Sequence, residues 1–381
     1  MTDGRLSRYE AILRGLERKS RARSLSGRAG ADFASNDYLG LAGSPRLAAA
    51  VEAAIGRGVP VGAAGSRLLR GNHPEHEALE TEAAAFFGVG RALYMGAGYA
   101  ANVAILSALP QRGDLVVYDE LIHASAHEGM ALTKAETVSV PHNDAGAAAD
   151  AIARWRAAGG KGVPWIAVET VYSMDGDRAP LDDLVGITES SGGFLIADEA
   201  HATGVLGPDG RGLTARWEGR DWLVALHTCG KALGTSGALV TAPAVLIDFL
   251  VNRAKPFIYA TAPSPLLAAA TREALRILVD EPERRSAHAA LVAAANRSAA
   301  TRLGIAPSGS HILPVILGGN ARATAVAARL REAGFDVRAV RPPTVPEGTA
   351  RLRVSLTLNV DPSTVEAMLD ALAAAMTEVP A

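Results

Sequence analysis

Lys231 stands in the string HTCGKALGTSGALV (227–240), which contains no Asp or Glu. The apolar run WLVAL (222–226) comes directly before this string and is typical of a buried strand. Lysine is among the residues that are least often buried without a partner. Burial among small side chains favours the neutral amine over the ammonium, and a neutral amine can form a Schiff base. The sequence therefore makes Lys231 a candidate catalytic residue.

Further residues that can do chemistry follow other apolar runs, at the points where strands are expected to end. They are Asp119 and His123 at the end of DLVVYD, Glu169, Ser173 and Asp175 after WIAV, Asp198, Glu199 and His201 after FLIA, and Thr228 beside Lys231. Gly96 and Gly98 form a Gly-x-Gly turn directly before a helical stretch. Ligands of parallel sheets bind at the carboxyl ends of the strands, which lie at one edge. We expect these side chains to share that edge.

Taken singly, each of these residues also has a structural interpretation. Gly96 and Gly98 suit a tight turn as well as a phosphate held at a helix N-terminus. Asp198 could cap a helix, His201 could be a buried structural histidine, and Lys231 could extend its ammonium to water. Together, a lysine, a carboxylate and a phosphate cradle match what pyridoxal 5′-phosphate requires. In this interpretation Lys231 forms the Schiff base and Asp198 keeps the ring nitrogen of the cofactor protonated.

Two histidine pairs have spacings that zinc sites also use. HASAH (123–127) places its histidines on one helical face, but it lacks the glutamate of HExxH and no third ligand is near in the sequence. HPEH (73–76) is interrupted by proline, in a segment that we expect to be a loop. Asp182 and Asp183 are typical of charges in the first turn of a helix. The sequence therefore predicts no metal site.

Short apolar runs alternate with helical stretches from residue 91 to about residue 242. This alternation predicts an α/β fold with a mainly parallel sheet between helices, and the pattern after residue 285 predicts a smaller α+β domain. The expected segments are an N-terminal helix and arm (1–40), a large cofactor-binding domain (41–284) and a small domain (285–381). The expected strands are 91–95, 114–119, 137–140, 165–171, 194–198, 222–226 and 237–242, and the expected helices include 99–109, 144–158, 181–191, 320–333 and 361–376.

Composition narrows the class of protein. The chain has 381 residues, of which 49% are hydrophobic and 20% charged, with a formal net charge of -2. A nearly neutral chain is not expected to bind nucleic acid or an anionic membrane surface as its main partner. The sequence has no apolar stretch of the roughly 20 residues that a membrane span needs, and its charged start does not resemble a signal peptide. With the single cysteine Cys229, these features predict a cytoplasmic protein.

The motifs as a set resemble the α-oxoamine synthases. These are fold-type I pyridoxal-phosphate enzymes that condense an amino acid with an acyl thioester and release carbon dioxide. The resemblance runs from about residue 30 to the C-terminus, in the same order. Its strings are NDYLGL (36–41), AAGSRLLRGNHPEHEALE (63–80), GYAAN (98–102), DELIHAS (119–125), VYSMDGDRAPL (171–181), DEAHATGVLGPDGRG (198–212), TCGKALGTSGA (228–238), NRAKPFIYATAP (252–263) and RPPTVPEGTARLRVSLT (341–357).

The last of these strings is most similar to members that use glycine and a pimeloyl thioester in biotin synthesis. The resemblance thus implies glycine and pimeloyl-coenzyme A or pimeloyl-acyl carrier protein as substrates. It also implies a homodimer whose subunits share their active sites.

The resemblance implies roles for individual residues around the cofactor. Lys231 corresponds to the Schiff-base lysine, Asp198 to the partner of the ring nitrogen, and His123 to the ring that stacks on the cofactor. The other implied cofactor contacts are His201 and Ser173 near the phenolic oxygen, Gly98, Tyr99 and Thr228 around the phosphate, and Thr261 from the other subunit. Glu169 corresponds to a supporting carboxylate of the catalytic group.

The resemblance also implies substrate contacts, and it has two departures. Asn36 and Arg353 correspond to groups that hold the glycine carboxylate, and Thr344 to one that meets the acyl substrate. The N-terminal arginine that meets substrate in the family could be Arg21 or Arg23. The chain has Ala202 where the family usually has Gly, beside His201.

Other functions stay open from the sequence. The chain could be another α-oxoamine synthase, namely a glycine C-acetyltransferase, a 5-aminolevulinate synthase or a serine-using synthase. It could also be an aminotransferase of the same fold, or a protein that binds the cofactor without turnover. In RLRVSLT (351–357) the alternation places Arg351 and Arg353 on one strand face. Both could be solvated, but the resemblance favours Arg353 as a substrate ligand and Arg351 as structural.

Overall fold

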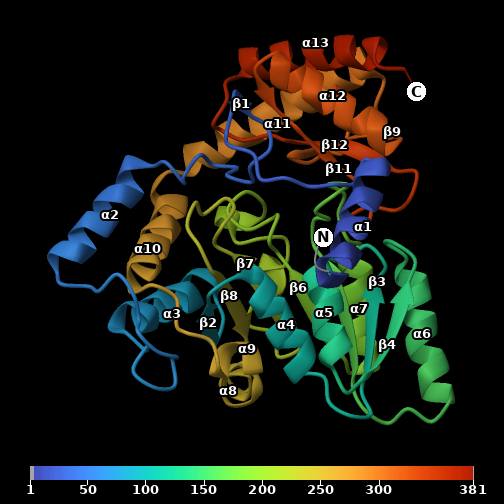
Figure 1. Cartoon of the computed structure of the whole chain (residues 1–381). Coiled ribbons are helices and arrows are strands. Elements are labelled where there is room, and N and C mark those ends of the chain that lie inside the picture. The colour runs from blue at the N-terminus through green and yellow to red at the C-terminus, as the bar shows by residue number, and fades with distance from the viewer. Residues whose placement is uncertain (1–3, 381) are drawn as a thin grey trace. The chain divides into compact units, whose positions relative to one another are not determined.

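The computed structural model describes residues 4–380, and its largest element is a seven-stranded sheet. The order across this sheet is β2-β8-β7-β6-β5-β3-β4 (Figure 1). Strand β8 pairs antiparallel with β2 and β7, and the other pairings are parallel. The predicted α/β class with a mainly parallel sheet is thereby confirmed. The strands are β2 (Arg91–Met95), β3 (Leu115–Asp119), β4 (Glu136–Val140), β5 (Pro164–Glu169), β6 (Phe194–Asp198), β7 (Leu223–Thr228) and β8 (Ala238–Ala242).

Helices cover both faces of this sheet, because its strands are apolar on both sides. Successive side chains of a strand point to opposite faces, so Val116 packs into one apolar cluster while Leu115 and Val117 pack into the other. The first face carries α4 (Gly98–Ala108), α5 (Ala124–Leu132), α8 (Ala244–Arg253) and α9 (Lys255–Ile258). The second carries α6 (Ala145–Ala157) and α7 (Leu181–Ser191). The short 3-10 helices η1 (Pro208–Gly210) and η2 (Ala215–Trp217) precede β7.

Three helices flank the β2 end of the sheet, and the sequence did not predict them. They are α2 (Pro45–Gly56), α3 (Pro74–Phe87) and α10 (Pro265–Asp280), and α10 packs against both others. The expectation of a loop at HPEH is wrong, because His73 accepts a hydrogen bond from the Glu75 backbone N–H and so caps α3. Proline at the first position of a helix is compatible with this start.

Strands and helices of the C-terminal third form a second apolar core. Strand β12 (Ala350–Ser355) lies between β9 (Ile312–Gly318) and β11 (Arg338–Val340), antiparallel to both. The helices are α11 (Pro282–Leu303), α12 (Asn320–Glu332) and α13 (Pro362–Glu378). The short strands β1 (Ala31–Asp32) and β10 (Phe335–Asp336) pair in parallel. Helix α1 (Gly4–Arg18) precedes them and has no buried residue.

The described chain divides into two compact units that do not follow the chain order. One unit comprises residues 37–173 and 177–287, and the other comprises 4–36, 174–176 and 288–380. The N-terminal segment and the tripeptide 174–176 thus group with the C-terminal third. The predicted boundaries at 40 and 284 stay a prediction.

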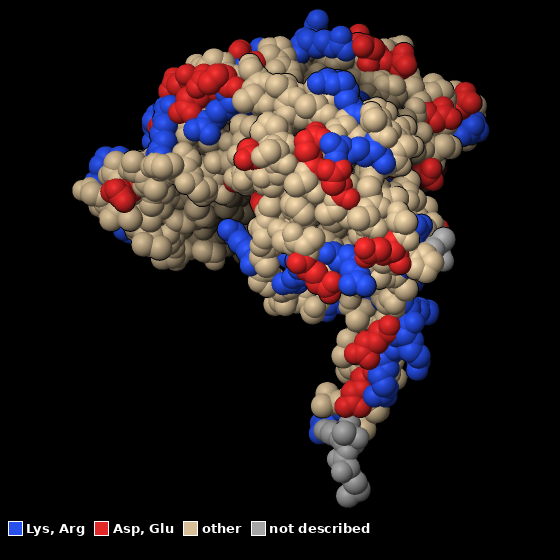
Figure 2. Space-filling view, turned by 90° about the horizontal axis from the view of Figure 1, so that it is seen from above, with Lys and Arg blue, Asp and Glu red and all other residues tan. Residues whose placement is uncertain are grey.

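The described surface shows how the near-neutral charge is distributed. On the face drawn in Figure 2, acidic and basic side chains alternate in small groups rather than forming a region of one sign. Among the described helices, none combines the length and the apolar character that crossing a membrane requires.

Candidate active site

A cavity of about 290 Å³ opens where β5, β6 and β7 end and β8 begins. We call it the Lys231 cavity. It brings together seven residues that the sequence predicted as site residues, from five separate segments of the chain. The roles of these residues stay predictions, although their proximity is observed. The cavity is lined by Gly96, Ala97, Gly98, Tyr99, Asn102, His123, Ser125, Glu169, Asp198, Ala200, Thr228, Gly230, Lys231, Ser236 and Gly237.

The amine of Lys231 is held by a histidine and, through it, a tyrosine. His201 Nε2 lies 2.8 Å from Lys231 Nζ, and His201 Nδ1 lies 2.6 Å from the Tyr38 hydroxyl. His201 and Tyr38 are buried, so this contact withdraws the lysine amine from water on one side. A neutral imidazole has one donor and one acceptor nitrogen, and its two contacts therefore link the proton positions of Lys231 and Tyr38.

Asp198 is oriented by an asparagine that also reaches toward His123. The Asn102 side-chain amide donates to Asp198 Oδ2 at 2.7 Å and to Ser125 Oγ at 2.9 Å. Ser125 Oγ lies 2.7 Å from His123 Nδ1. Asp198 Oδ1 accepts the Ala200 backbone N–H at 2.9 Å. These hydrogen bonds fix the Asp198 carboxylate, which still lines the cavity. The carboxylate can therefore accept a hydrogen bond from the ring of a bound ligand.

Glu169 contributes a buried oxygen without a partner. Its Oε2 accepts the backbone N–H of Ser173 at 3.0 Å, whereas Oε1 is buried and has no hydrogen-bond partner among the described residues. Burial, and next the negative charge of Asp198, raise the pKa of Glu169 to about 8. Buried polar atoms usually have a hydrogen-bond partner. Glu169 Oε1 could therefore accept a hydrogen bond from a polar ligand, or it could carry the proton that the raised pKa favours.

His123 begins α5 and faces the cavity. His123 is exposed in the described chain, yet partial desolvation by the surrounding protein lowers the pKa of His123, even though Asp198 opposes this effect. The lowered pKa favours the neutral imidazole, and this uncharged ring can stack on an aromatic cofactor.

The first turn of α4 forms a cradle beside Thr228. The N-cap residue Ala97 makes no side-chain hydrogen bond to this turn, which leaves its N–H groups to an anion. A Cβ atom placed on Gly98 would lie 2.5 Å from Thr228 Cγ2, closer than real side chains approach. Glycine is therefore needed here for close packing. With Lys231, Asp198 and the partnerless Glu169 oxygen, this cradle fits pyridoxal phosphate.

Several predicted site residues do not line the Lys231 cavity. His201 and Ser173 lie behind it, against Lys231 and Glu169. Thr261 is exposed and pairs by a backbone bridge with Ser66. Asn36, Arg353, Thr344 and Arg21 belong to the other unit.

Arg351 and Arg353 are both buried in β12, so the alternative that they are solvated is wrong. Arg353 donates to Asn36 Oδ1 at 2.9 Å and to Ser355 Oγ at 2.7 Å. Arg351 forms an ion pair with Asp175 and also donates to Thr349. These partners are compatible with the prediction that Arg353 is a substrate ligand and Arg351 is structural.

Thr344 lines a smaller cavity of about 170 Å³ in its own unit, together with Arg23, Arg341 and three further residues. The Arg23 guanidinium donates to Thr344 Oγ1 at 3.4 Å. Arg21, in contrast, forms an ion pair with Glu347. Burial, and next the nearby charge of Arg23, lower the pKa of Arg341. None of the six residues that line this cavity is acidic.

Ala202 is fully buried, and its backbone does not require glycine. Its φ is not among the positive values of the described chain. The methyl group is therefore accommodated beside His201 without backbone strain.

Sequence reasoning missed Tyr38 and Asn102. Both lie in strings that carried the resemblance, NDYLGL and GYAAN, but neither follows a strand end. The signal that could have found them is the polar residue inside an otherwise apolar segment, because a buried amide or hydroxyl needs a partner.

Comparison with known proteins agrees with this geometry. The chain belongs to the aminotransferase class I and II family, whose model matches residues 29–372. It is 43% identical to 8-amino-7-oxononanoate synthase of Anaeromyxobacter dehalogenans, over 100% of this chain and 98% of that protein. Within the broad family the chain thus belongs with the 8-amino-7-oxononanoate synthases. The predicted α-oxoamine synthase resemblance and the predicted class of pyridoxal-phosphate-dependent acyltransferase are confirmed.

Two solved structures extend the comparison to the fold. Serine palmitoyltransferase from S. paucimobilis superposes with a TM-score of 0.89 at 25% identity, covering 98% of each chain. An 8-amino-7-oxononanoate synthase from Francisella tularensis gives a TM-score of 0.76 at 26% identity, covering 92% of this chain and 98% of that one. The predicted fold-type I architecture is therefore confirmed.

Proposed function

We propose that the chain condenses glycine with a pimeloyl thioester and releases carbon dioxide, the free thiol carrier and 8-amino-7-oxononanoate, in biotin synthesis. The observation that carries this proposal is the lysine amine of Lys231, held against His201 in a cavity that also presents Asp198. The names of the relatives supply the product, and the family resemblance supplies the substrates. We also propose that the protein acts in the cytoplasm.

Pyridoxal phosphate, when bound, supplies an electron sink for the carbanion at the glycine α-carbon. Lys231 Nζ is the group that removes the α-proton, since it is the amine at the centre of the cavity and general bases must lie within hydrogen-bond reach of their proton. His201 Nε2 orients Nζ, and Tyr38 fixes the orientation of His201. Asp198 holds a proton on the ring nitrogen, and Asn102 holds Asp198 in place.

Arg353 and Asn36 are the proposed ligands of the glycine carboxylate. A guanidinium offers two parallel charge-assisted hydrogen bonds to a carboxylate. Asn36 Oδ1 and Ser355 Oγ accept hydrogen bonds from Arg353 Nη1 and so fix the plane of the guanidinium. This assignment rests on the family motif and on that fixed orientation.

The cavity beside Thr344 is the proposed place of the far carboxylate of the acyl chain. Burial and the nearby charge of Arg23 lower the pKa of Arg341 there, and a bound carboxylate would offset this repulsion. Arg23 is therefore the proposed N-terminal substrate ligand, because Arg21 already pairs with Glu347. This choice also favours a dicarboxylic acyl chain over a fatty one.

A homodimer with shared sites is part of the proposal. The segments around Ser66 and Thr261, which the backbone bridge joins, expose large apolar side chains. Leu69 is 82% exposed and Tyr259 is 79% exposed. Apolar side chains gathered on a surface are typical of an interface, and a second copy of the chain would bring the Thr261 of one subunit to the cavity of the other.

The experiment offers glycine, alanine and serine against a panel of acyl thioesters and measures thiol release and product mass. The panel includes pimeloyl-coenzyme A, pimeloyl-acyl carrier protein, the matched monocarboxylic heptanoyl-coenzyme A, acetyl-coenzyme A, succinyl-coenzyme A and palmitoyl-coenzyme A. The proposal expects glycine with a pimeloyl thioester to react fastest, and heptanoyl to be a poor donor. Preference for acetyl or succinyl with glycine, or for palmitoyl with serine, would assign another member of the family. Cofactor binding without any thiol release would identify a binding protein.

A further inference from the structure

A second polar cluster lies on the same edge of the sheet as the Lys231 cavity, at the ends of β3 and β4. We call it the His142 clamp, and it consists of Asp119, His142, Asn143 and Asp177. His142 Nδ1 lies 2.9 Å from Asp119 Oδ1, and His142 Nε2 lies 2.7 Å from Asp177 Oδ2. The clamp residues do not line the Lys231 cavity.

Both ring nitrogens of His142 face carboxylates, which defines the charge of the ring. A neutral imidazole has one N–H, whereas an imidazolium has two. Only the imidazolium donates to Asp119 and Asp177 at once. Burial alone would lower the pKa of His142, but its hydrogen bonds to these two carboxylates raise it to about 10.

Asn143 completes the clamp from a backbone conformation that few residues adopt. Its φ of 57° lies in the left-handed region, which asparagine tolerates better than most residues. In this conformation the Asn143 backbone N–H donates to Asp119 Oδ2 at 2.7 Å, and its side-chain amide donates to Asp177 Oδ2 at 2.6 Å. Two successive residues therefore join the same two carboxylates.

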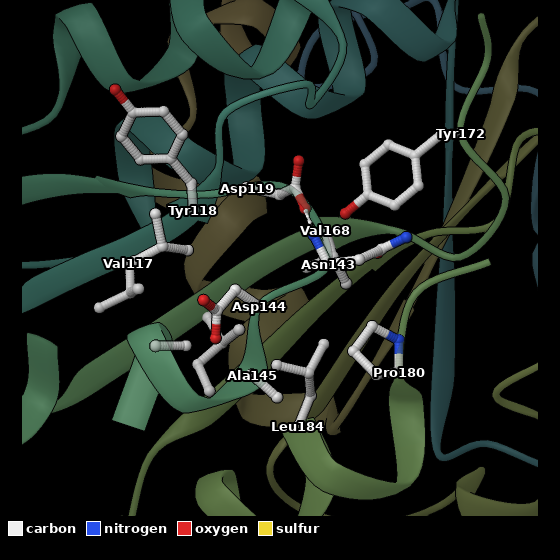
Figure 3. A pocket seen from close by; sticks show the side chains of 13 residues that line it. Val117, Tyr118, Asp119, Asn143, Asp144, Ala145, Val168, Tyr172, Pro180 and Leu184 are labelled. Atoms are coloured by element: carbon white, nitrogen blue, oxygen red, sulfur yellow. Dashed lines mark hydrogen bonds between the residues drawn. The ribbon is translucent and has the colours of Figure 1, made fainter. Parts of the chain in front are cut away.

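One end of the clamp holds the turn that presents His123. Asp119 Oδ1 accepts the backbone N–H of Leu121 at 2.8 Å, and the Asp119 carbonyl accepts that of Ile122 at 3.1 Å. His123 follows directly and begins α5. Asp119 is only 3% exposed and lies beside the buried Tyr172 (Figure 3). Without the clamp, its carboxylate would therefore be buried without the cation that balances its charge. Figure 3 shows Asp119, Asn143 and the Tyr172 hydroxyl gathered around a small cavity with an apolar floor.

The other end of the clamp holds the stem of the hairpin that follows Glu169. The Tyr172 backbone N–H donates to the Asp177 carbonyl at 2.9 Å, and Val171 pairs with Arg178. The Tyr172 ring meets His142 edge-on, with ring centroids 4.4 Å apart. Ser173, next in the chain, holds the Glu169 carboxylate. His142 thus connects the segments that carry two walls of the Lys231 cavity.

A metal ion is the alternative occupant of a site with two carboxylates and a histidine. Within residues 4–380, no group of three or more His, Cys, Asp or Glu side chains is arranged to hold one. The imidazolium itself stands between the carboxylates, at hydrogen-bond distance from each.

We propose that His142 is a positioning residue: it ties Asp119 to Asp177 and thereby fixes the His123 ring and the Glu169–Ser173 segment against the cofactor. The clamp itself is independent of the reaction, whereas its consequence for catalysis rests on the proposed function. His142 touches neither cofactor nor substrate in this proposal, and it acts through the turn at Leu121 and the hairpin at Tyr172.

The test compares the full-length chain with His142→Phe, which keeps a planar ring but cannot donate. His127→Phe is the matched control, because His127 lies on the exposed side of α5 outside the clamp. Hydrogen exchange of the cofactor-free chain should rise about tenfold or more in residues 119–125 and 170–178 of His142→Phe, since local opening governs exchange. The circular dichroism of added pyridoxal phosphate should change, and turnover should fall roughly 10- to 100-fold with little change in the glycine KM.

Unchanged exchange in both segments would overturn the clamp. Faster exchange with unchanged cofactor dichroism and turnover would overturn the positioning role. Should His142→Phe fail to fold, Asp177→Asn removes one charged contact while keeping the side-chain shape, and the same readouts apply. A chain without any glycine condensation would refute the proposed function but leave the exchange and dichroism results decisive for the clamp.

Discussion

The Lys231 cavity and the His142 clamp lie on one edge of the same sheet, and both gather titratable side chains from several segments. In the clamp, one imidazolium bridges two carboxylates, although Asp177 Oδ1 and Asn143 Oδ1 have no hydrogen-bond partner among the described residues. The adjoining cavity measures only about 10 Å³. The Lys231 cavity measures about 290 Å³ and leaves Glu169 Oε1 without a partner in the described chain. Both clusters leave a buried oxygen open, but only the Lys231 cavity has room for a ligand beside it.

The largest expected effect separates two aspartates that end strands β6 and β3 of the sheet, Asp198 and Asp119. Asp198→Asn should reduce turnover roughly 10²- to 10³-fold, as loss of a preorganised charge partner does, while the melting temperature changes little. Asp119→Asn should instead lower the melting temperature, because it weakens the hydrogen bonds to His142 and Asn143. Its turnover should fall only by the roughly 10- to 100-fold expected from loosening the His142 clamp. Steady-state kinetics and thermal unfolding of both variants check this. Equal losses of turnover in the two variants, with an unchanged melting temperature for Asp119→Asn, would contradict the different roles of the two aspartates.

The next effect concerns the two buried arginines of β12. Losing one charge-assisted hydrogen bond costs about 1.5–3 kcal/mol, or roughly 10- to 150-fold in glycine binding. Arg353→Lys should raise the glycine concentration needed for half-maximal binding by that factor, since lysine offers a point charge and not a fork. Arg351→Lys should weaken glycine binding much less, because Arg351 pairs with Asp175. A spectroscopic glycine titration decides, and equal small shifts would contradict the assignment of Arg353.

The last effect is on how the stability of the cofactor-free chain depends on pH. The pKa of Glu169 rises from its ordinary 4.5 to about 8, so its contribution to stability is present below about pH 4.5 and is lost as the pH rises through 8. The pKa of His142 rises from 6.5 to about 10, so its contribution is present below about pH 6.5 and is lost toward pH 10.

Glu169→Gln should therefore be more stable than the wild type at pH 9 and similar to it near pH 4.5. His142→Phe should be less stable than the wild type at pH 6, with a difference that narrows toward pH 10. Thermal unfolding across this range measures both. Parallel curves for the wild type and both variants would mean that neither group titrates as described.

Local sequence patterns were sufficient for the elements that carry the site. Strand β6 has the bounds that were expected, and Asp198 stands at its end. Apolar alternation depends on neighbours along the chain, and so does a Gly-x-Gly turn. Only β5 ended early, at Glu169, because Thr170 to Arg178 turn into the hairpin.

Partners from distant segments could not be predicted in the same way. Tyr38 meets His201 across 163 residues, and Asn102 meets Asp198 across 96. The sequence around His142 has no apolar periodicity that would indicate its role. That role depends on contacts with Asp119 and Asp177, which lie in other segments of the chain. Hydrogen-bond partners of this kind follow from tertiary packing, and a single sequence contains no signal for which residues will meet.

The central claim is that Lys231 is the residue to which pyridoxal phosphate becomes attached. The full-length chain is incubated with the cofactor, reduced with borohydride, digested and mapped by mass spectrometry, with Lys231→Ala as the control. We expect one modified peptide, containing Lys231, and its loss in a Lys231→Ala variant that still folds. Modification at Lys134 or Lys255 instead, or an unaltered map in the variant, would contradict it.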